Sequence, residues 1–207
     1  MVKKIIFATG NQNKMREIRE IMGNLPVEIL SMKEAGIGAD ITEDGTTFEE
    51  NAAIKAKAVA ELLPEQDRDT IVLADDSGLE IDALNGEPGI YSARYAGEHG
   101  NDAKNNAKLI ADLQPIRAAK PDTPIKGMFV CVLAMVRHAD DPLPIIAQGL
   151  WHGEILDAPH GDGGFGYDPL FWLPELQATA ASLSATDKNS ISHRGQAIEQ
   201  LLAQLPL

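Results

Sequence analysis

Two adjacent carboxylates and a hydroxyl, Asp75-Asp76-Ser77, directly follow the apolar run of residues 71–74. A run that is apolar at every position is typical of a short strand covered on both faces, and ligands of α/β proteins gather where such strands end. A carboxylate held there is suited to bind Mg²⁺ or to orient a water. The alternative is a surface turn in which Asp or Ser bonds its own backbone.

Neighbouring ionised carboxylates repel each other, and a divalent cation relieves that repulsion directly. We therefore expect a tight turn after residue 74 that carries a metal ligand. Glu43, in the loop of residues 42–45, is the candidate for a second acidic ligand from another segment. Its alternative role is that of a solvated loop charge.

A second polar stretch separates an expected strand over residues 3–8 from a helix expected over about residues 14–25. It consists of Thr9, Gly10, Asn11, Gln12, Asn13 and Lys14. Backbone amides at a helix N-terminus, with a glycine and a lysine beside them, form a phosphate cradle, although the spacing of a P-loop is absent. The alternative is an ordinary strand-to-helix turn with an exposed lysine.

A glycine-dense loop over residues 160–169 contains a third candidate group, Phe165, Gly166, Tyr167 and Asp168. Such a loop lets a planar base stack on an aromatic ring while the backbone approaches closely. A tight turn before the next strand would have the same composition, so the sequence leaves both interpretations open.

A fourth group, Lys188, His193 and Arg194, falls in the opening turn of a helix expected from about residue 190. The helix dipole disfavours cations at this end unless an anion or polar ligand compensates. Local inconsistencies of this kind tend to mark functional sites.

Composition limits the classes of function. The chain has 207 residues and a formal charge of −13, which disfavours a nucleic-acid backbone or an anionic membrane as partner. No apolar stretch approaches the roughly 18 residues that a membrane-spanning helix needs. The single cysteine, Cys131, lies in an apolar run and is expected to be buried, which fits a reducing cytoplasm. We expect one domain over residues 1–207.

The remaining pattern predicts an α/β or α+β chain with a mixed sheet. A helix with a capping box at Thr47 and Glu50 is expected to end before Pro64, and another, capped by Asp102, is expected through Leu113. Apolar segments over residues 126–137 and 144–150 predict an antiparallel hairpin.

Six segments occur in one order along the chain: TGNQNKMREI (9–18), TFEENAAIKA (47–56), ADDSGL (74–79), PGIYSARYAG (88–97), GGFGYDPLF (163–171) and ISHRGQA (191–197). In sequence and spacing they closely resemble the non-canonical purine nucleoside triphosphate pyrophosphatases, the inosine/xanthosine triphosphate family. The resemblance covers essentially the whole chain.

The resemblance implies hydrolysis of ITP, dITP and XTP to the monophosphate and pyrophosphate, with Mg²⁺, by a cytoplasmic homodimer. It also implies an elongated mixed sheet flanked by helices, with two lobes around a central nucleotide-binding cleft. Asp76 corresponds to the family's metal-linked catalytic base, and Ser77 to a substrate contact. The remaining substrate positions implied are residues 9–14, Lys55, residues 165–168, Lys188, His193 and Arg194.

One departure concerns the metal. Family members often carry two consecutive acids where this chain has Thr42-Glu43, so Glu43 is the expected second ligand beside Asp76. Magnesium held by these two carboxylates would polarise the phosphates while Asp76 orients a water for attack on the α-phosphorus. We also expect Arg194→Ala to raise KM for ITP far more than it alters the melting temperature.

Three other functions remain as alternatives. One is a pyrophosphatase for modified pyrimidine or methylated triphosphates on a related architecture. Another is a sensor that binds a purine triphosphate without cleaving it. The third, nucleic-acid binding, is disfavoured by the charge of −13.

Overall fold

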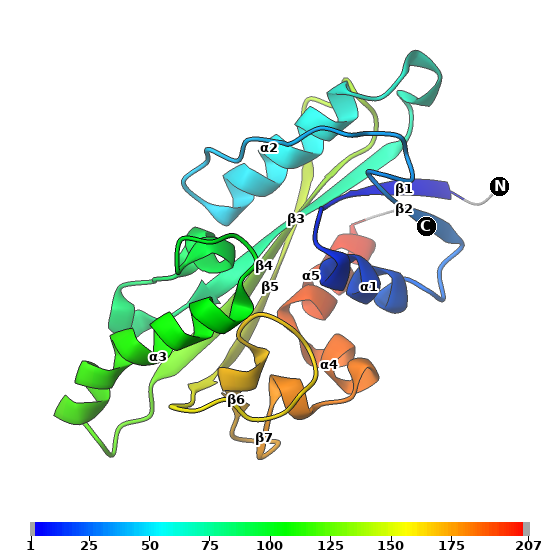
Figure 1. Ribbon diagram of the computed structural model, residues 1–207. Coiled ribbons are helices and arrows are strands. Elements are labelled where there is room, and N and C mark those ends of the chain that lie inside the picture. The colour runs from blue at the N-terminus through cyan, green and yellow to red at the C-terminus, as the bar shows by residue number, and fades with distance from the viewer. Residues whose placement is uncertain (1–2, 205–207) are drawn as a thin grey trace. The chain divides into compact units, whose positions relative to one another are not determined.

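The computed structural model describes residues 3–204 (Figure 1). It contains the strands β1 (Lys3–Ala8), β2 (Val27–Ser31), β3 (Ile71–Glu80), β4 (Lys126–Val136), β5 (Ile145–Ile155), β6 (Phe171–Leu173) and β7 (Ala178–Thr179). The α-helices are α1 (Gln12–Ile21), α2 (Phe48–Glu61), α3 (Asp102–Ala119), α4 (Ala185–Ile191) and α5 (His193–Ala203). Short 3-10 turns are η1 (Glu65–Asp67), η2 (Asp82–Leu84), η3 (Gly89–Arg94), η4 (Asp168–Leu170) and η5 (Ala180–Ser182).

The strands form one seven-stranded sheet in the order β2-β1-β3-β4-β5-β6-β7. β1 pairs in parallel with both β2 and β3, whereas β6 pairs antiparallel with β5 and β7. The expectation of a mixed sheet with helices is therefore confirmed. β4 and β5 are neighbours, as the predicted hairpin requires. The chain divides into two compact units, and the arrangement of two lobes around a cleft stays a prediction.

Within the described residues, unit 1 comprises residues 3–76, 131–149 and 193–204. In its core, Met15 and Ile18 of α1 and Ile198 of α5 pack on Phe7 and Leu73 of the sheet. Helix α2 lies on the opposite side of β1 and β3 from α1 and α5 (Figure 1). Cys131 belongs to this core and is fully buried, as expected.

Unit 2 comprises residues 77–130 and 150–192. Leu109 and Leu113 of α3 are fully buried against an aromatic cluster of the sheet, in which the rings of Phe129 and Phe171 are 4.5 Å apart. Helix α3 continues through Pro115 to Ala119, six residues beyond its predicted end. No helix within residues 3–204 is long and apolar enough to cross a membrane.

Three local predictions were wrong. Helix α3 is capped by Asn101 and not by Asp102. The turn expected after residue 74 does not exist, because β3 continues through Asp75, Asp76 and Ser77 to Glu80. The single last helix is two helices, broken at Ser192, which has an extended backbone. Lys188 therefore lies in the last turn of α4, where the helix dipole favours a cation.

Candidate active site

The continuous strand β3 explains how two adjacent aspartates can coexist. Successive side chains of a strand point to opposite faces, so Asp75 and Asp76 face different surroundings. Asp75 is fully buried, where its carboxylate accepts hydrogen bonds from Lys14 Nζ and, at 2.9 Å, from Arg194 Nε. Burial alone would raise the pKa of Asp75, but Arg194 and Lys14 together hold that pKa well below its ordinary value. Cations of the chain itself therefore stabilise this charge.

Asp76 has a different environment. Its Oδ2 atom is buried and has no hydrogen-bond partner within residues 3–204. Burial raises the pKa of Asp76, Lys14 and Lys55 oppose that rise, and the neighbouring charges of Asp75 and Glu43 add to it. A buried carboxylate oxygen without a donor is costly unless a cation or a water completes its environment.

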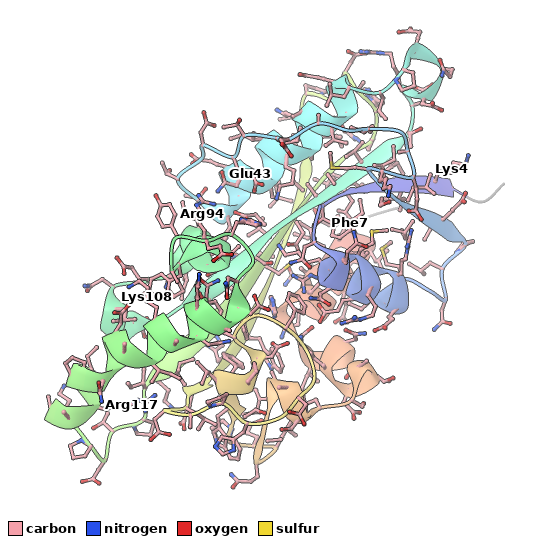
Figure 2. All side chains as sticks on the ribbon, in the orientation of Figure 1. Lys4, Phe7, Glu43, Arg94, Lys108 and Arg117 are labelled. Atoms are coloured by element: carbon pink, nitrogen blue, oxygen red, sulfur yellow. The ribbon has the colours of Figure 1, made fainter. Side chains whose placement is uncertain are left out.

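Lys55 contacts both acidic segments of unit 1, the loop that contains Glu43 and the strand that contains Asp75. Its Nζ donates to Glu43 at 2.7 Å and to the backbone carbonyl of Asp75 at 3.0 Å. The side chains of Lys55 and Glu43 are 13% and 30% exposed, so the pair is partly shielded from water. Thr47 caps α2 by accepting from the backbone N–H of Glu50, as predicted, and this fixes the start of the helix that carries Lys55. Glu43 lies in the loop before α2 (Figure 2).

The carboxylates near Asp76 are too few to coordinate a metal by protein ligands alone, but they are enough for magnesium. Residues 3–204 contain no group of three or more His, Cys, Asp and Glu side chains placed to hold a metal. Mg²⁺ usually takes one or two carboxylates and completes its shell with water and substrate phosphates. The unpartnered oxygen of Asp76, with Glu43 in its neighbourhood, matches this requirement.

The expected phosphate cradle forms the N-terminus of α1, but several of its amides are already bonded. Asn11 caps the helix, accepting from the backbone N–H groups of Asn13 at 2.9 Å and Lys14 at 3.1 Å. Thr9 Oγ1 accepts from the backbone N–H of Asn11. The sequence did not reveal this self-capping, and a bound phosphate would share or replace these bonds.

The basic pair after Ser192 begins α5, and both side chains are buried in unit 1. Arg194 donates to Glu17 as well as to Asp75, so two carboxylates offset its charge at the helix N-terminus. Gly149 of β5 permits this close packing, since a Cβ there would stand 1.9 Å from the carbonyl oxygen of His193. Glu17 and Gly149 were not predicted, and the signal for Glu17 was a charge adjacent to the apolar face of α1.

In unit 2, the loop of residues 163–168 is organised around Asp168. Its Oδ2 accepts from Lys188 Nζ at 2.5 Å and from the backbone N–H of Phe165 at 2.8 Å. Lys188 Nζ lies 4.9 Å from the centre of the half-buried Phe165 ring. Tyr167 is buried, and its hydroxyl donates to the carbonyl of Ser92 at 2.8 Å. Of the two rings, Phe165 is therefore the one suited to stack on a base.

The candidate residues are thus gathered in two sets. Unit 1 brings together Lys14, Lys55, Glu43 and Asp76. It also contains the buried Arg194, which pairs with Asp75. Unit 2 brings together Phe165, Asp168 and Lys188, and it includes the half-buried Ser77.

Comparison with known proteins gives a consistent result. The model of the Ham1 family matches residues 5–204. This chain belongs to the Ham1 family. A dITP/XTP pyrophosphatase of Acinetobacter baumannii is 55% identical over 197 residues, which are 94% of this chain and 91% of that protein. A dITP/XTP pyrophosphatase of Clostridium perfringens is 51% identical over 97% of this chain and 96% of its own length.

Solved structures share the Ham1 fold with this chain. A HAM1 protein from Coxiella burnetii matches with a TM-score of 0.83 and 43% identity, over 97% of each chain. A nucleoside-triphosphatase / dITP/XTP pyrophosphatase from Mycobacterium abscessus matches with a TM-score of 0.70 and 37% identity, covering 99% of this Ham1 chain and all of that one.

Proposed function

We propose that this protein hydrolyses dITP, XTP and ITP to the nucleoside monophosphate and pyrophosphate, with Mg²⁺ as cofactor. One observation carries the chemistry. The buried Oδ2 of Asp76 has no hydrogen-bond partner within residues 3–204. The charges of Lys14 and Lys55 lower the pKa of this carboxyl group, and the charge of Glu43 raises it. The names of relatives at 51–55% identity supply the substrate class.

The phosphate half of the reaction is assigned to unit 1. A water attacks the α-phosphorus, the bond from that phosphorus to the bridging oxygen breaks, and pyrophosphate leaves with the electron pair. Asp76 orients the water and takes its proton. In the metal-free protein, burial raises the pKa of Asp76 above that of an ordinary aspartate. When bound by Asp76 and Glu43, magnesium would supply a Lewis acid to the phosphate oxygens.

Lys14 and Lys55 provide positive charge for the phosphates. A nucleoside triphosphate carries a charge of about −4 near neutral pH, and this acidic protein has to offset it locally. Both ammonium groups are held by oxygens of β3 or its neighbours, so they are placed before substrate arrives. Such pre-placed charge is the principal contribution of a protein to phosphoryl-type transfer.

The base half of the reaction is assigned to unit 2. Phe165 offers a ring for stacking, and Lys188 places donors beside that ring. Hypoxanthine and xanthine carry a carbonyl acceptor at position 6, where adenine carries an amino donor. The ammonium group of Lys188, a donor beside the Phe165 ring, favours the former, because adenine would leave a donor unpaired.

The decisive test is a panel of triphosphates with Mg²⁺, scored for both pyrophosphate and monophosphate. We expect dITP, XTP and ITP to be cleaved far faster than ATP, GTP or modified pyrimidine triphosphates, and excess chelator to stop turnover. Binding without monophosphate would identify a sensor, whereas preference for a pyrimidine would identify a different pyrophosphatase. Gel filtration and cell fractionation test the predicted homodimer and cytoplasmic location.

A further inference from the structure

Helix α3 holds one residue, Gly166, by both of its backbone polar groups; Gly166 belongs to the loop of residues 163–168, called the Phe165 loop below. The backbone N–H of Gly166 donates to Asp102 Oδ2 at 2.7 Å, and Asn106 Nδ2 donates to the carbonyl of Gly166 at 2.8 Å. Asp102 and Asn106 are four residues apart on a helix and so lie on one face of α3. The two side chains together bracket Gly166.

The bracketed residue has a special backbone. Gly166 has φ of +63°, a left-handed conformation that other residues rarely adopt. A Cβ at this position would meet no atom within 4 Å, so backbone conformation, rather than space, is what requires glycine. The hydrogen bonds from α3 therefore act on the conformation that sets the direction of the chain between Phe165 and Tyr167.

Other contacts secure different parts of the loop. The backbone N–H of His160 donates to the carbonyl of Pro169, and that of Gly163 donates to the carbonyl of Ala181. Asp168 holds the backbone N–H of Phe165. The contacts from α3 are the ones made to the peptide groups of Gly166, immediately after the stacking ring.

Helix α3 is a rigid support for this contact. Leu109 and Leu113 anchor it in the core of unit 2, and Asn101 caps its first turn by accepting from the backbone N–H of Lys104. The Oδ1 atom of Asn106 is buried without a hydrogen-bond partner within residues 3–204, so the carbonyl of Gly166 sets the orientation of this amide. Sites supported from regular elements are held more closely than sites supported by loops.

We propose that Asp102 and Asn106 are positioning residues that fix the nucleobase end of the substrate through Gly166. This inference rests on the proposed function only in that the Phe165 loop receives the base. Neither residue is expected to touch the reacting phosphate. Their loss should therefore weaken recognition of the base and leave recognition of the polyphosphate unchanged.

The test compares Asp102→Ala, Asp102→Asn and Asn106→Ala, with Lys104→Ala as matched control. Lys104 lies on the same turn of α3, but its side chain is 62% exposed and pairs with Glu98. The dissociation constants of inosine monophosphate and of inorganic tripolyphosphate are measured by calorimetry for each protein. KM and kcat for dITP are then measured with Mg²⁺.

We expect Asp102→Ala to weaken inosine monophosphate binding and to raise KM, each by about ten-fold. This factor corresponds to the free energy of one hydrogen bond to a charged acceptor. Tripolyphosphate binding should stay within about two-fold of wild type. Asp102→Asn, which keeps an acceptor oxygen, should recover most of the loss, and Asn106→Ala should show the same split more weakly. Lys104→Ala should resemble wild type.

The inference is overturned if Asp102→Ala and Asn106→Ala bind inosine monophosphate like wild type, or if both ligands weaken equally. If Asp102→Ala does not fold, Asp102→Asn and Asn106→Ala decide the question. A wild-type protein that binds inosine monophosphate but releases no pyrophosphate would contradict the proposed function alone, because the binding comparison is independent of turnover.

Discussion

Arg194 donates from Nε to Oδ2 of Asp75 at 2.9 Å, and the two side chains are only 1% and 0% exposed. Glu17 accepts from the same guanidinium, so one buried cation serves two buried carboxylates. Burial by itself would lower the pKa of Arg194, but Asp75 and Glu17 raise it above its ordinary value. The three residues join α1, β3 and α5 within unit 1.

Arg194→Ala should destabilise the protein strongly, because it removes the buried cation that Asp75 and Glu17 share. The expected loss is about 3–5 kcal/mol in the free energy of unfolding, or roughly 10 °C in melting temperature for a chain of this size. Arg194→Lys keeps the charge but not the planar fork, and should lose less. Thermal unfolding measures both, and an alanine variant that melts within about 2 °C of wild type would contradict this role. The expectation from sequence, a rise in KM far larger than the effect on melting temperature, is revised accordingly.

The overall elements were predictable because their periodicity and caps are local. Thr47 capped α2 as expected, and the order of the six motifs predicted the family that the family model then confirmed. The course of β3 was not predictable, since two adjacent aspartates are typical of a turn. What keeps Asp75 inside a strand is charge from Lys14 and Arg194, which lie 61 and 119 residues away in sequence.

The candidate site was predicted as a set of residues, but not as a set of contacts. The position of Glu17 beside the apolar face of α1 signals a buried charge but not its partner Arg194, and Gly149 on β5 carries no sequence signal for its contact with the start of α5. The same holds for Asp102, which was expected to cap α3. Asn101 takes that role instead, and this leaves the carboxylate of Asp102 to accept from Gly166.

Asp141 should contribute stability that depends on pH. Its side chain is 0% exposed and accepts from Arg137 Nε at 2.7 Å and Nη2 at 2.6 Å, and these bonds lower its pKa below the ordinary 3.8. A lowered pKa in the folded state means that the stabilisation is complete above pH 3.8 and is lost as the pH falls toward the lowered value. Asp141→Asn should therefore melt below wild type at pH 7, with a gap that narrows at acidic pH.

Asp140→Asn is the matched control for this measurement. Asp140 is 79% exposed and pairs with Arg68 at the surface, where ion pairs contribute little. Thermal unfolding between pH 3 and pH 7 should show no comparable effect for this variant. A gap for Asp141→Asn that widens as the pH falls would have the wrong sign and would refute the assignment.

Asp76→Asn should abolish turnover without harming the fold. The amide cannot take the proton of the attacking water, and loss of a general base typically costs 10²–10⁴-fold in rate. The melting temperature should stay equal to or rise above that of wild type, because a neutral group replaces a half-buried charge whose Oδ2 has no donor within residues 3–204. Pyrophosphate release and thermal unfolding measure the two effects, with the exposed Asp67→Asn as control. A fully active Asp76→Asn enzyme would remove Asp76 from the catalytic role.

Glu43→Gln should weaken the apparent affinity of the enzyme for magnesium more than Asp44→Asn does. The charge of Glu43 raises the pKa of Asp76, and the carboxylate of Glu43 pairs with Lys55. The neighbouring Asp44, in contrast, is exposed. Losing even an outer partner of a metal site costs about 10–100-fold in affinity, so the Mg²⁺ concentration for half-maximal rate should rise by at least about ten-fold in Glu43→Gln. Titration of dITP hydrolysis with Mg²⁺ measures this shift. A shift found only for Asp44→Asn would identify Asp44, and not Glu43, as the second metal ligand. Unchanged titrations for both variants would mean that neither residue binds the metal and would leave Asp76 as the proposed carboxylate ligand.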